Sequence, residues 1–163
     1  MFPVNFIILL LITLVAHALP SDSKEKLHIK SDTSTYNYKT GVNTFDGHVT
    51  LDQGTSHITA DRLITQSNAS HKIQEATAYG LVQPAHYWTL PTDSKPEVHA
   101  HAGIIKYFPI AANIAMERNV YVTQGKNIFQ GQLVLYNMTD QTITVPANTN
   151  GRSVLVYNPD EPI

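Results

Sequence analysis

A chain of 163 residues is long enough for one domain and too short for two ordinary ones. Its formal net charge of −2 argues against a protein that tracks nucleic-acid phosphates, which needs a basic excess. The chain has no cysteine, and this excludes disulfide scaffolds, thiolate zinc sites and cysteine nucleophiles. After residue 18, Val, Ile, Thr and Tyr outnumber Leu, Glu, Lys and Met. Because β-branched and aromatic side chains suit a pleated sheet, the composition predicts an all-β domain.

The chain begins with an apolar run that is typical of a secretory signal. Residues 6–15 form a ten-residue apolar stretch, which is shorter than the about 20 residues that cross a bilayer. Ala16 and Ala18 follow as a small-x-small cleavage site. We therefore expect a signal peptide over residues 1–18, a mobile segment over 19–26 and a mature protein outside the cytoplasm. Residues 1–5 contain no Lys or Arg, so an uncleaved N-terminal anchor is the alternative.

Short runs of alternating apolar and polar residues fill the rest of the chain, with turn residues between them. Such runs at spacings of about 8 to 12 residues are typical of antiparallel sandwiches and barrels. Pro109 interrupts the segment nearest to a helical pattern, residues 104–116. We expect one all-β domain over 27–157 and a short tail over 158–163. The expected strand segments are 27–29, 36–38, 44–45, 48–51, 56–60, 63–65, 73–79, 87–90, 98–107, 120–122, 128–129, 133–135 and 143–145.

An internal repeat joins the two halves of this domain. Residues 48–54 align with residues 119–125 at an offset of 71, and the same offset places Ile58 on Phe129. Each copy is expected to form a strand, a turn at Gln-Gly and a second strand, because Gly accepts the positive φ of a tight hairpin. The repeat predicts a sheet built from two similar halves.

Histidines at 99 and 101 lie at the spacing that puts two side chains on one face of a strand. Two imidazoles in this arrangement are able to bind a metal, with His86 and His28 as the only further ligands that we can suggest. Partly exposed strand histidines are the simpler interpretation. We therefore expect neither a metal nor another cofactor, and keep a metal-dependent β-barrel enzyme as an alternative.

Three carboxylates are candidates for acid–base chemistry, but they lie beside expected turns, where such side chains usually bond local backbone. They are Asp52, Asp61 and Glu117. The sequence also lacks the G-x-S-x-G, H-E-x-x-H, G-x-x-x-x-G-K-[ST] and G-x-G-x-x-G motifs. We therefore expect no enzymatic activity.

The apolar positions of the strands admit two interpretations. The first is the packed core of a sandwich, which composition alone favours. The second is an incompletely filled interior that accepts acyl chains. The segment 27–29 follows the mobile start, so we expect an edge strand there, and an edge strand is able to template a second chain.

Several stretches, in order and spacing, resemble the OstA-like (LptA-type) family of lipopolysaccharide transport bridge proteins. The resemblance covers residues 27–157. The stretches that carry it are 27–32, 45–54, 58–61, 78–80 with 83–85, 100–107, 119–125, 129–131 with Tyr136, and 151–152.

The resemblance implies an open, twisted β-jellyroll of about 16 antiparallel strands. It implies a periplasmic protein that binds the lipid A part of lipopolysaccharide between two sheets. It also implies stacking head to tail with itself, an inner-membrane partner of the LptC type and an outer-membrane partner of the LptD type. A protein of the LptC type, or a bridge component that acts only as a scaffold, is the alternative within the family.

Carried onto this sequence, the resemblance gives two groups of expected lipid contacts. The residues expected to line the mouth and to face the acyl chains are Leu27, Ile29, Phe45, Val49, Leu51, Tyr87, Ile105, Tyr107, Val120, Val122 and Phe129. The residues expected near the lipid A phosphates are Lys24, Lys26 and Lys30.

Overall fold

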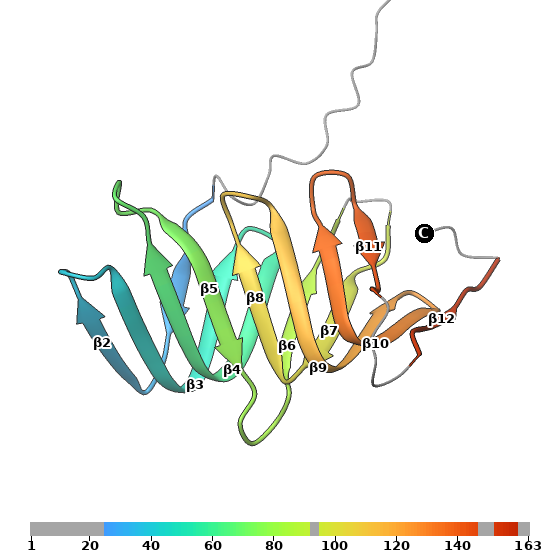
Figure 1. Cartoon of the computed structure of the whole chain (residues 1–163), viewed down its shortest axis with the longest axis horizontal. Coiled ribbons are helices and arrows are strands. Elements are labelled where there is room, and N and C mark those ends of the chain that lie inside the picture. The colour runs from blue at the N-terminus through green and yellow to red at the C-terminus, as the bar shows by residue number, and fades with distance from the viewer. Residues whose placement is uncertain (1–24, 92–94, 147–151, 160–163) are drawn as a thin grey trace, which may run out of the picture.

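A computed structural model describes residues 25–91, 95–146 and 152–159 (Figure 1). The expected signal peptide, most of the segment 19–26 and the end of the tail lie outside these residues. No helix in the described ranges is long and apolar enough to cross a membrane. The chain forms twelve strands, all paired antiparallel, in agreement with the expected all-β class.

The strands fall into two sets of six along the chain. The first set is β1 His28–Lys30, β2 Thr33–Asn37, β3 Val42–Gln53, β4 Ser56–Ser67, β5 Ile73–Tyr79 and β6 Ala85–Thr89. The second set is β7 Val98–Ala102, β8 Ile104–Phe108, β9 Asn113–Gln124, β10 Asn127–Asn137, β11 Thr142–Thr144 and β12 Val154–Val156.

The two sets have the same topology. β1 and β2 pair with β3, which pairs with β4, and β4 pairs with both β5 and β6. β7 to β12 repeat this pattern strand for strand. The offset of 71 also relates the residue pairs of the two sets. Ile29 pairs with Leu51 in the first set, and the residues 71 positions later, Ala100 and Val122, pair in the second. The second set continues the sheet of the first, because β5 pairs with β8 and β6 pairs with β7.

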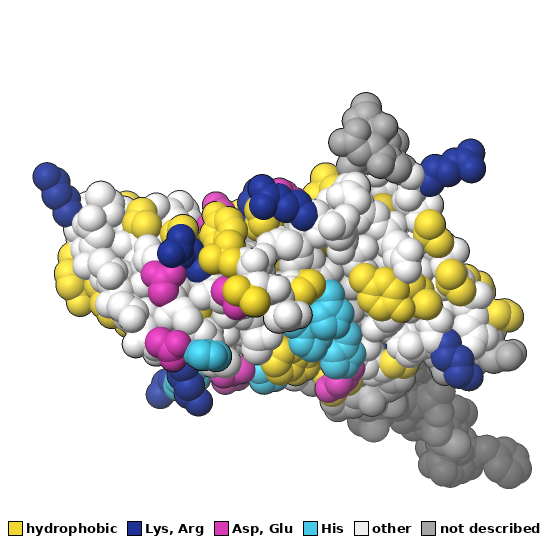
Figure 2. Space-filling view, turned by 90° about the horizontal axis from the view of Figure 1, so that it is seen from below, with side chains coloured by type: hydrophobic (Ala, Val, Ile, Leu, Met, Phe, Trp, Pro, Cys, Tyr) yellow, Lys and Arg dark blue, Asp and Glu magenta, His cyan; other side chains and the backbone are white. Residues whose placement is uncertain are grey.

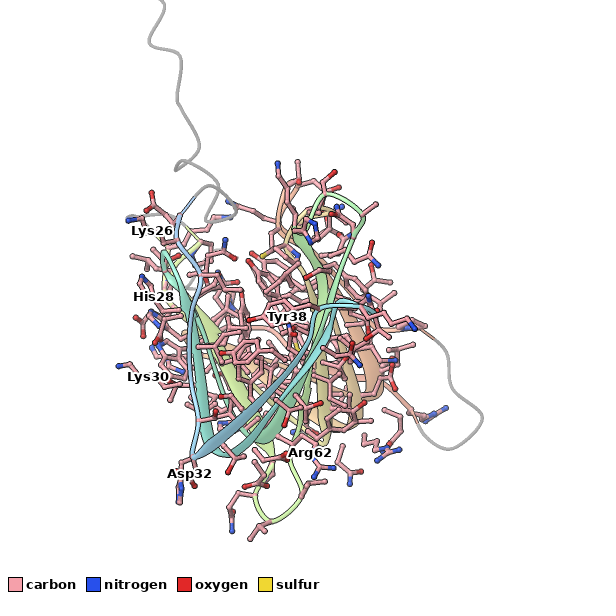
Figure 3. All side chains as sticks on the ribbon, turned by 90° about the vertical axis from the view of Figure 1, so that its left-hand side faces the viewer. Lys26, His28, Lys30, Asp32, Tyr38 and Arg62 are labelled. Carbon is pink, nitrogen blue, oxygen red and sulfur yellow. The ribbon has the colours of Figure 1, made fainter. Side chains whose placement is uncertain are left out.

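Four long strands, β3, β4, β9 and β10, bend and so divide the sheet into two walls (Figure 1). One half of each long strand pairs with β2, β5, β8 and β11, which we call the first wall. The other half pairs with β1, β6, β7 and β12, the second wall. Seen from its N-terminal end, the molecule is closed along the bend, near Asp32 and Arg62 (Figure 3). The opposite side, between Lys26 and Tyr38, is where the two walls are not joined by strand pairing in the described residues.

A β-bulge produces the bend, and it occurs at equivalent places in both halves. The register shifts between Asp46 and Val49 in the first half and between Gly131 and Leu133 in the second. The bulged residues have positive φ, 78° at Gly47 and 67° at its equivalent Arg118. An extra residue increases the local twist and turns the strand, so each long strand passes from one wall into the other.

The expectation of about 16 strands is higher than the twelve found in the described residues. The bulges explain the difference, because each long strand remains one strand while contributing a segment to each wall. If the two parts of each long strand are counted separately, the number is about 16, whereas the continuous strands number twelve in the described residues.

We expect Gly47→Ala to lower the free energy of unfolding by about 2 kcal/mol, measured by urea denaturation. At a φ of 78° an L-residue is strained, and the new methyl group would meet the carboxylate of Asp32. Arg118→Gly is the matched control, since it relieves the same conformation in the second half and should keep or raise stability. An equal loss in both variants would show that the positive φ is not what matters.

Candidate functional site

The space between the two walls is filled by one apolar cluster, and this cluster contains most of the residues expected to contact lipid. Nine of the eleven are buried in it, with side chains at most 7% exposed. They are Phe45, Val49, Leu51, Tyr87, Ile105, Tyr107, Val120, Val122 and Phe129. They come from five strands of both walls, because alternate residues of a strand share a face. Their contact with a lipid remains a prediction.

The other two expected lining residues, Leu27 and Ile29, are partly buried and pack against the edge of the same cluster. Ile29 lies in β1, the first strand of the second wall, opposite Leu51 of β3. This position is at the N-terminal end of the interior, and the expected lipid contact of Leu27 and Ile29 there remains a prediction.

The expected phosphate contacts lie elsewhere. Lys26 and Lys30 are exposed, and their side chains point away from the space between the walls (Figure 3). Alternation explains this, because Leu27 and Ile29 take the inward positions. Lys24 lies outside the described residues. A phosphate contact of Lys26 or Lys30 would therefore be made on the outer face or at the rim, and it too remains a prediction.

The interior contains more residues than the sequence interpretation selected. Two sequence patterns could have identified the additional large residues. One is the alternation along each strand, and the other is the offset of 71, which relates Phe45 to Met116 and Leu63 to Val134. The additional large residues are Ile58, Leu63, Val98, Ile114, Met116, Val134 and Tyr136. Alternation with His99 and His101 places Ala100 and Ala102 on the inward face. Five alanines belong to the cluster: Ala76, Ala78, Ala85, Ala100 and Ala102.

Side-chain contacts close the side on which the walls are not joined by strand pairing. The Tyr107 hydroxyl of the first wall donates a hydrogen bond of 2.9 Å to Oε1 of Gln53 in the second wall. The Tyr87 hydroxyl of the second wall contacts Sδ of Met138, just after β10, at 3.9 Å. The Gln53 amide donates to the Glu25 carbonyl at 3.0 Å and so ties down the start of the described chain. The open side is thus held by side chains, whereas the bend is held by backbone.

Burial disfavours ionisation of two interior tyrosines, Tyr87 and Tyr136. Desolvation raises the pKa of the Tyr87 phenol well above its ordinary value and also raises that of Tyr136. A buried neutral phenol is a hydrogen-bond donor with an apolar ring, so both residues contribute apolar surface to the interior, and Tyr87 adds its contact with Met138.

The candidate carboxylates have local partners. Asp52 Oδ1 is 2.7 Å from His57 Nδ1, and Glu117 Oε1 is 2.6 Å from Lys106 Nζ. Asp61 accepts hydrogen bonds from the backbone N–H groups of Leu81 and Val82, both at 2.6 Å, and these bonds lower the pKa of its carboxyl group. Such partners are typical of structural carboxylates rather than of a general acid–base pair.

The histidines of β6 and β7 gather on the outer face of the second wall, where Figure 2 shows them as one cluster. His86 lies directly opposite His101, with ring centroids 4.3 Å apart. His99 is diagonal to His86, with ring centroids 5.4 Å apart. Desolvation, followed by the nearby His101 and His99, lowers the pKa of His86 to about 4. Its ring is therefore neutral near pH 7.

The rings of His86, His99 and His101 lie nearly parallel and do not converge on one point. Within the described ranges, no group of three or more His, Cys, Asp or Glu side chains is arranged to hold a metal ion. A catalytic zinc site needs three protein ligands and an open position. The alternative of a metal-dependent enzyme built on His99 and His101 therefore gains no support from the geometry.

These features define a class of protein: a small all-β domain of two repeated halves that shields an apolar interior between two walls and ends in free strand edges. The sequence profile of the family described as "LptA/(LptD N-terminal domain) LPS transport protein" matches residues 28–142. The chain belongs to this family.

Individual relatives agree with the profile. The chain is 25% identical over 138 residues to the lipopolysaccharide export system protein LptH of Pseudomonas aeruginosa, covering 85% of this chain and 78% of that protein. It is 26% identical over 154 residues to LptA of Escherichia coli K12, covering 94% of this chain and 82% of that protein. The crystal structure of LptH from P. aeruginosa, described as the LptA homologous periplasmic component of the lipopolysaccharide transport device, superposes with a TM-score of 0.78. At 23% identity it covers 86% of this chain and all of that one, and it supports the fold.

We expect Tyr107→Phe to lower the free energy of unfolding by about 1–2 kcal/mol, because it leaves Oε1 of buried Gln53 without this donor. Tyr121→Phe, on the outer face, should change it by less than about 0.5 kcal/mol. Urea denaturation measures both. Adding Gln53→Leu to Tyr107→Phe should cost less than the two single losses together, since both polar partners are then removed. Additive losses would mean that the two groups do not interact.

Proposed function

We propose that the chain is a periplasmic component of the bridge that carries lipopolysaccharide from the inner to the outer membrane. In this proposal the acyl chains of lipid A lie between the two walls. The observation that carries it is the continuous apolar cluster lined by both walls and held on one side only by side-chain contacts. Membership of the lipopolysaccharide transport family supports the choice of cargo.

The chemistry of the interior suits acyl chains. Burial of hydrocarbon contributes about 0.8 kcal/mol for each CH₂ group and requires no directional partner. The interior is packed with the chain's own side chains, so a lipid has to displace some of them or separate the walls. Separation breaks the contacts at Tyr107 and Tyr87 and leaves the strand pairing along the bend intact. The side without strand pairing is therefore the route of entry that costs least.

The ends of the sheet support head-to-tail assembly. Inside the chain, β5 pairs with β8 and β6 pairs with β7, which joins the first half to the second. By the repeat, β11 and β12 are the equivalents of β5 and β6, whereas β2 and β1 are the equivalents of β8 and β7. We infer that β11 and β12 of one copy pair with β2 and β1 of the next. A strand added to an exposed edge gains main-chain hydrogen bonds.

Exposure at the C-terminal end agrees with a missing neighbour. Tyr87 in β6 is 0% exposed, whereas Leu155 at the equivalent place in β12 is 59% exposed. Val154 and Val156 are exposed as well. At the other end, Tyr36 of β2 is 54% exposed. These apolar residues would be covered by a second copy in the way that the first half is covered by the second.

The repeat also gives the register of this contact. Tyr87 pairs with Ala100 between the two halves. Leu155 takes the place of Tyr87, because both pair with equivalent residues of the preceding long strand. Ile29 takes the place of Ala100 in the same way. We therefore expect Leu155 opposite Ile29 of the next copy, and Val154 opposite Lys30. The same free edges would receive partners of the LptC and LptD types.

We expect a photo-crosslinking amino acid at Ile29 or Tyr107 to form an adduct with lipopolysaccharide when the protein is expressed in cells that make it. Both side chains face the interior. Lys106, the outward neighbour of Tyr107, is the matched control position and should give weak adducts or none. Detection uses immunoblotting for lipopolysaccharide after irradiation.

Failure at Ile29 and Tyr107, with no lipopolysaccharide co-purifying, would remove the lipid-carrying part of the proposal. If assembly persisted under those conditions, the scaffold-only alternative would take its place. Equal adducts at inward and outward positions would place the lipid on the surface rather than between the walls.

We expect the double variant Val154→Cys with Lys30→Cys to form a ladder of covalent oligomers with a short thiol crosslinker, measured on denaturing gels. The chain has no native Cys, so these are its only thiols. Side chains directly opposite each other on paired strands lie about 5 Å apart. Val154→Cys with Ser31→Cys is the control, because residue 31 is out of register and on the other face. Equal crosslinking of both pairs would contradict the inferred register.

A further inference from the structure

The pair formed by His86 and His99 has a geometry that stacking alone does not require. Nε2 of His86 and Nδ1 of His99 lie 3.3 Å apart, so the two nitrogens face each other edge to edge. His86 comes from β6 and His99 from β7, next to each other in the second wall. The proposed function does not use either residue, because both lie on the outer face.

This separation is the one that two ligands have on a single metal ion. Zinc binds imidazole nitrogen at about 2.0–2.1 Å in tetrahedral geometry, which places two ligand nitrogens about 3.3–3.4 Å apart. The distance between the nitrogens of His86 and His99 already matches, and both rings have to turn so that their lone pairs point at one ion instead of at each other.

A carboxylate holds one ring in the form that a metal requires. Oε2 of Glu97 is 3.1 Å from Nε2 of His99. A carboxylate only accepts, so Nε2 of His99 carries the proton and Nδ1 keeps its lone pair toward His86. A metal-binding histidine commonly donates its other N–H to a carboxylate in this way. His86 stays neutral on binding as well, since its proton moves from Nε2 to Nδ1 through solvent.

The pair is partly open to solvent, since His86 is half-buried and the residues beside it are more exposed. The side chain of His99 is 40% exposed and that of Glu97 is 55% exposed. Figure 2 shows the histidines on the molecular surface with an acidic side chain beside them. Water is therefore available to complete the coordination of a bound ion.

We propose that His86 and His99 chelate one divalent transition-metal ion on the outer face, with Glu97 orienting His99 and water in the remaining positions. Imidazole suits Cu²⁺, Ni²⁺ and Zn²⁺, and Cu²⁺ binds most tightly in this series. His101 stacks parallel to His86, with an interplanar angle of 9°, so its ring does not point toward the same ion and it is not assigned as a ligand.

Trp88 provides a reporter for this site. It is the only Trp of the chain, and its ring centroid is 4.8 Å from that of His86. Titration of the purified protein with Cu²⁺ should quench Trp88 fluorescence in a saturable way at one equivalent. Electron paramagnetic resonance of the bound Cu²⁺ should show two nitrogen ligands. Excess Zn²⁺ should restore the fluorescence by competition.

Variants separate the pair from its neighbours. His86→Ala and His99→Ala should each weaken Cu²⁺ binding at least tenfold, and Glu97→Ala about tenfold. His28→Ala is the matched control, because His28 is the equivalent of His99 in the first half and has no histidine strand beside it. Binding that is unchanged in His86→Ala and His99→Ala, or lost equally in His101→Ala, would overturn the assignment. Circular dichroism confirms that each variant keeps its sheet, so a lost site is distinguished from a lost fold.

Discussion

The bend at the β-bulge of each long strand is the constraint on which the rest of the structure depends. Strand pairing continues through β3, β4, β9 and β10 from one wall into the other, so the closed side is held by main-chain hydrogen bonds. On the opposite side the walls meet in the described residues through side-chain contacts such as Tyr107 with Gln53, Tyr87 with Met138 and Lys95 with Gln141. One side is therefore difficult to separate and the other is easier, and this asymmetry gives the interior a direction of access.

Much of this arrangement could be predicted from the sequence, because it depends on local periods. Alternation of apolar residues identified inward positions such as Val49 and Leu51, and the offset of 71 placed Val120 and Val122 beside them in the second half. A period of two reports which face a residue occupies. It does not report whether a strand stays in one wall, so the segments 44–45 and 48–51 were expected as two strands where the structure has the single strand β3.

The remaining features depend on contacts between distant segments, for which the sequence carries no local signal. Gln53 is a buried polar residue because Tyr107, in β8, reaches it across the open side. The sequence offered His86 only as a possible partner of His99. The two residues are neighbours because β6 pairs with β7, and neither segment alone predicts that pairing. The residue type at position 47, Gly, is one that adopts a positive φ without strain. Its equivalent, Arg118, has a positive φ as well, and its residue type does not predict that conformation. The surrounding ladder imposes it.

The equivalence between the junction inside the chain and the edges at its two ends has a consequence for size. In the proposed assembly the contact between unlike edges is heterologous, and each added copy leaves the same two edges free. Strand twist would accumulate from copy to copy, so the product would be an open helical filament rather than a closed ring. The length of that filament would follow from mass action and from any partner that offers only one of the two edges. Such a partner would end the filament, so the partners at its two ends would set its span.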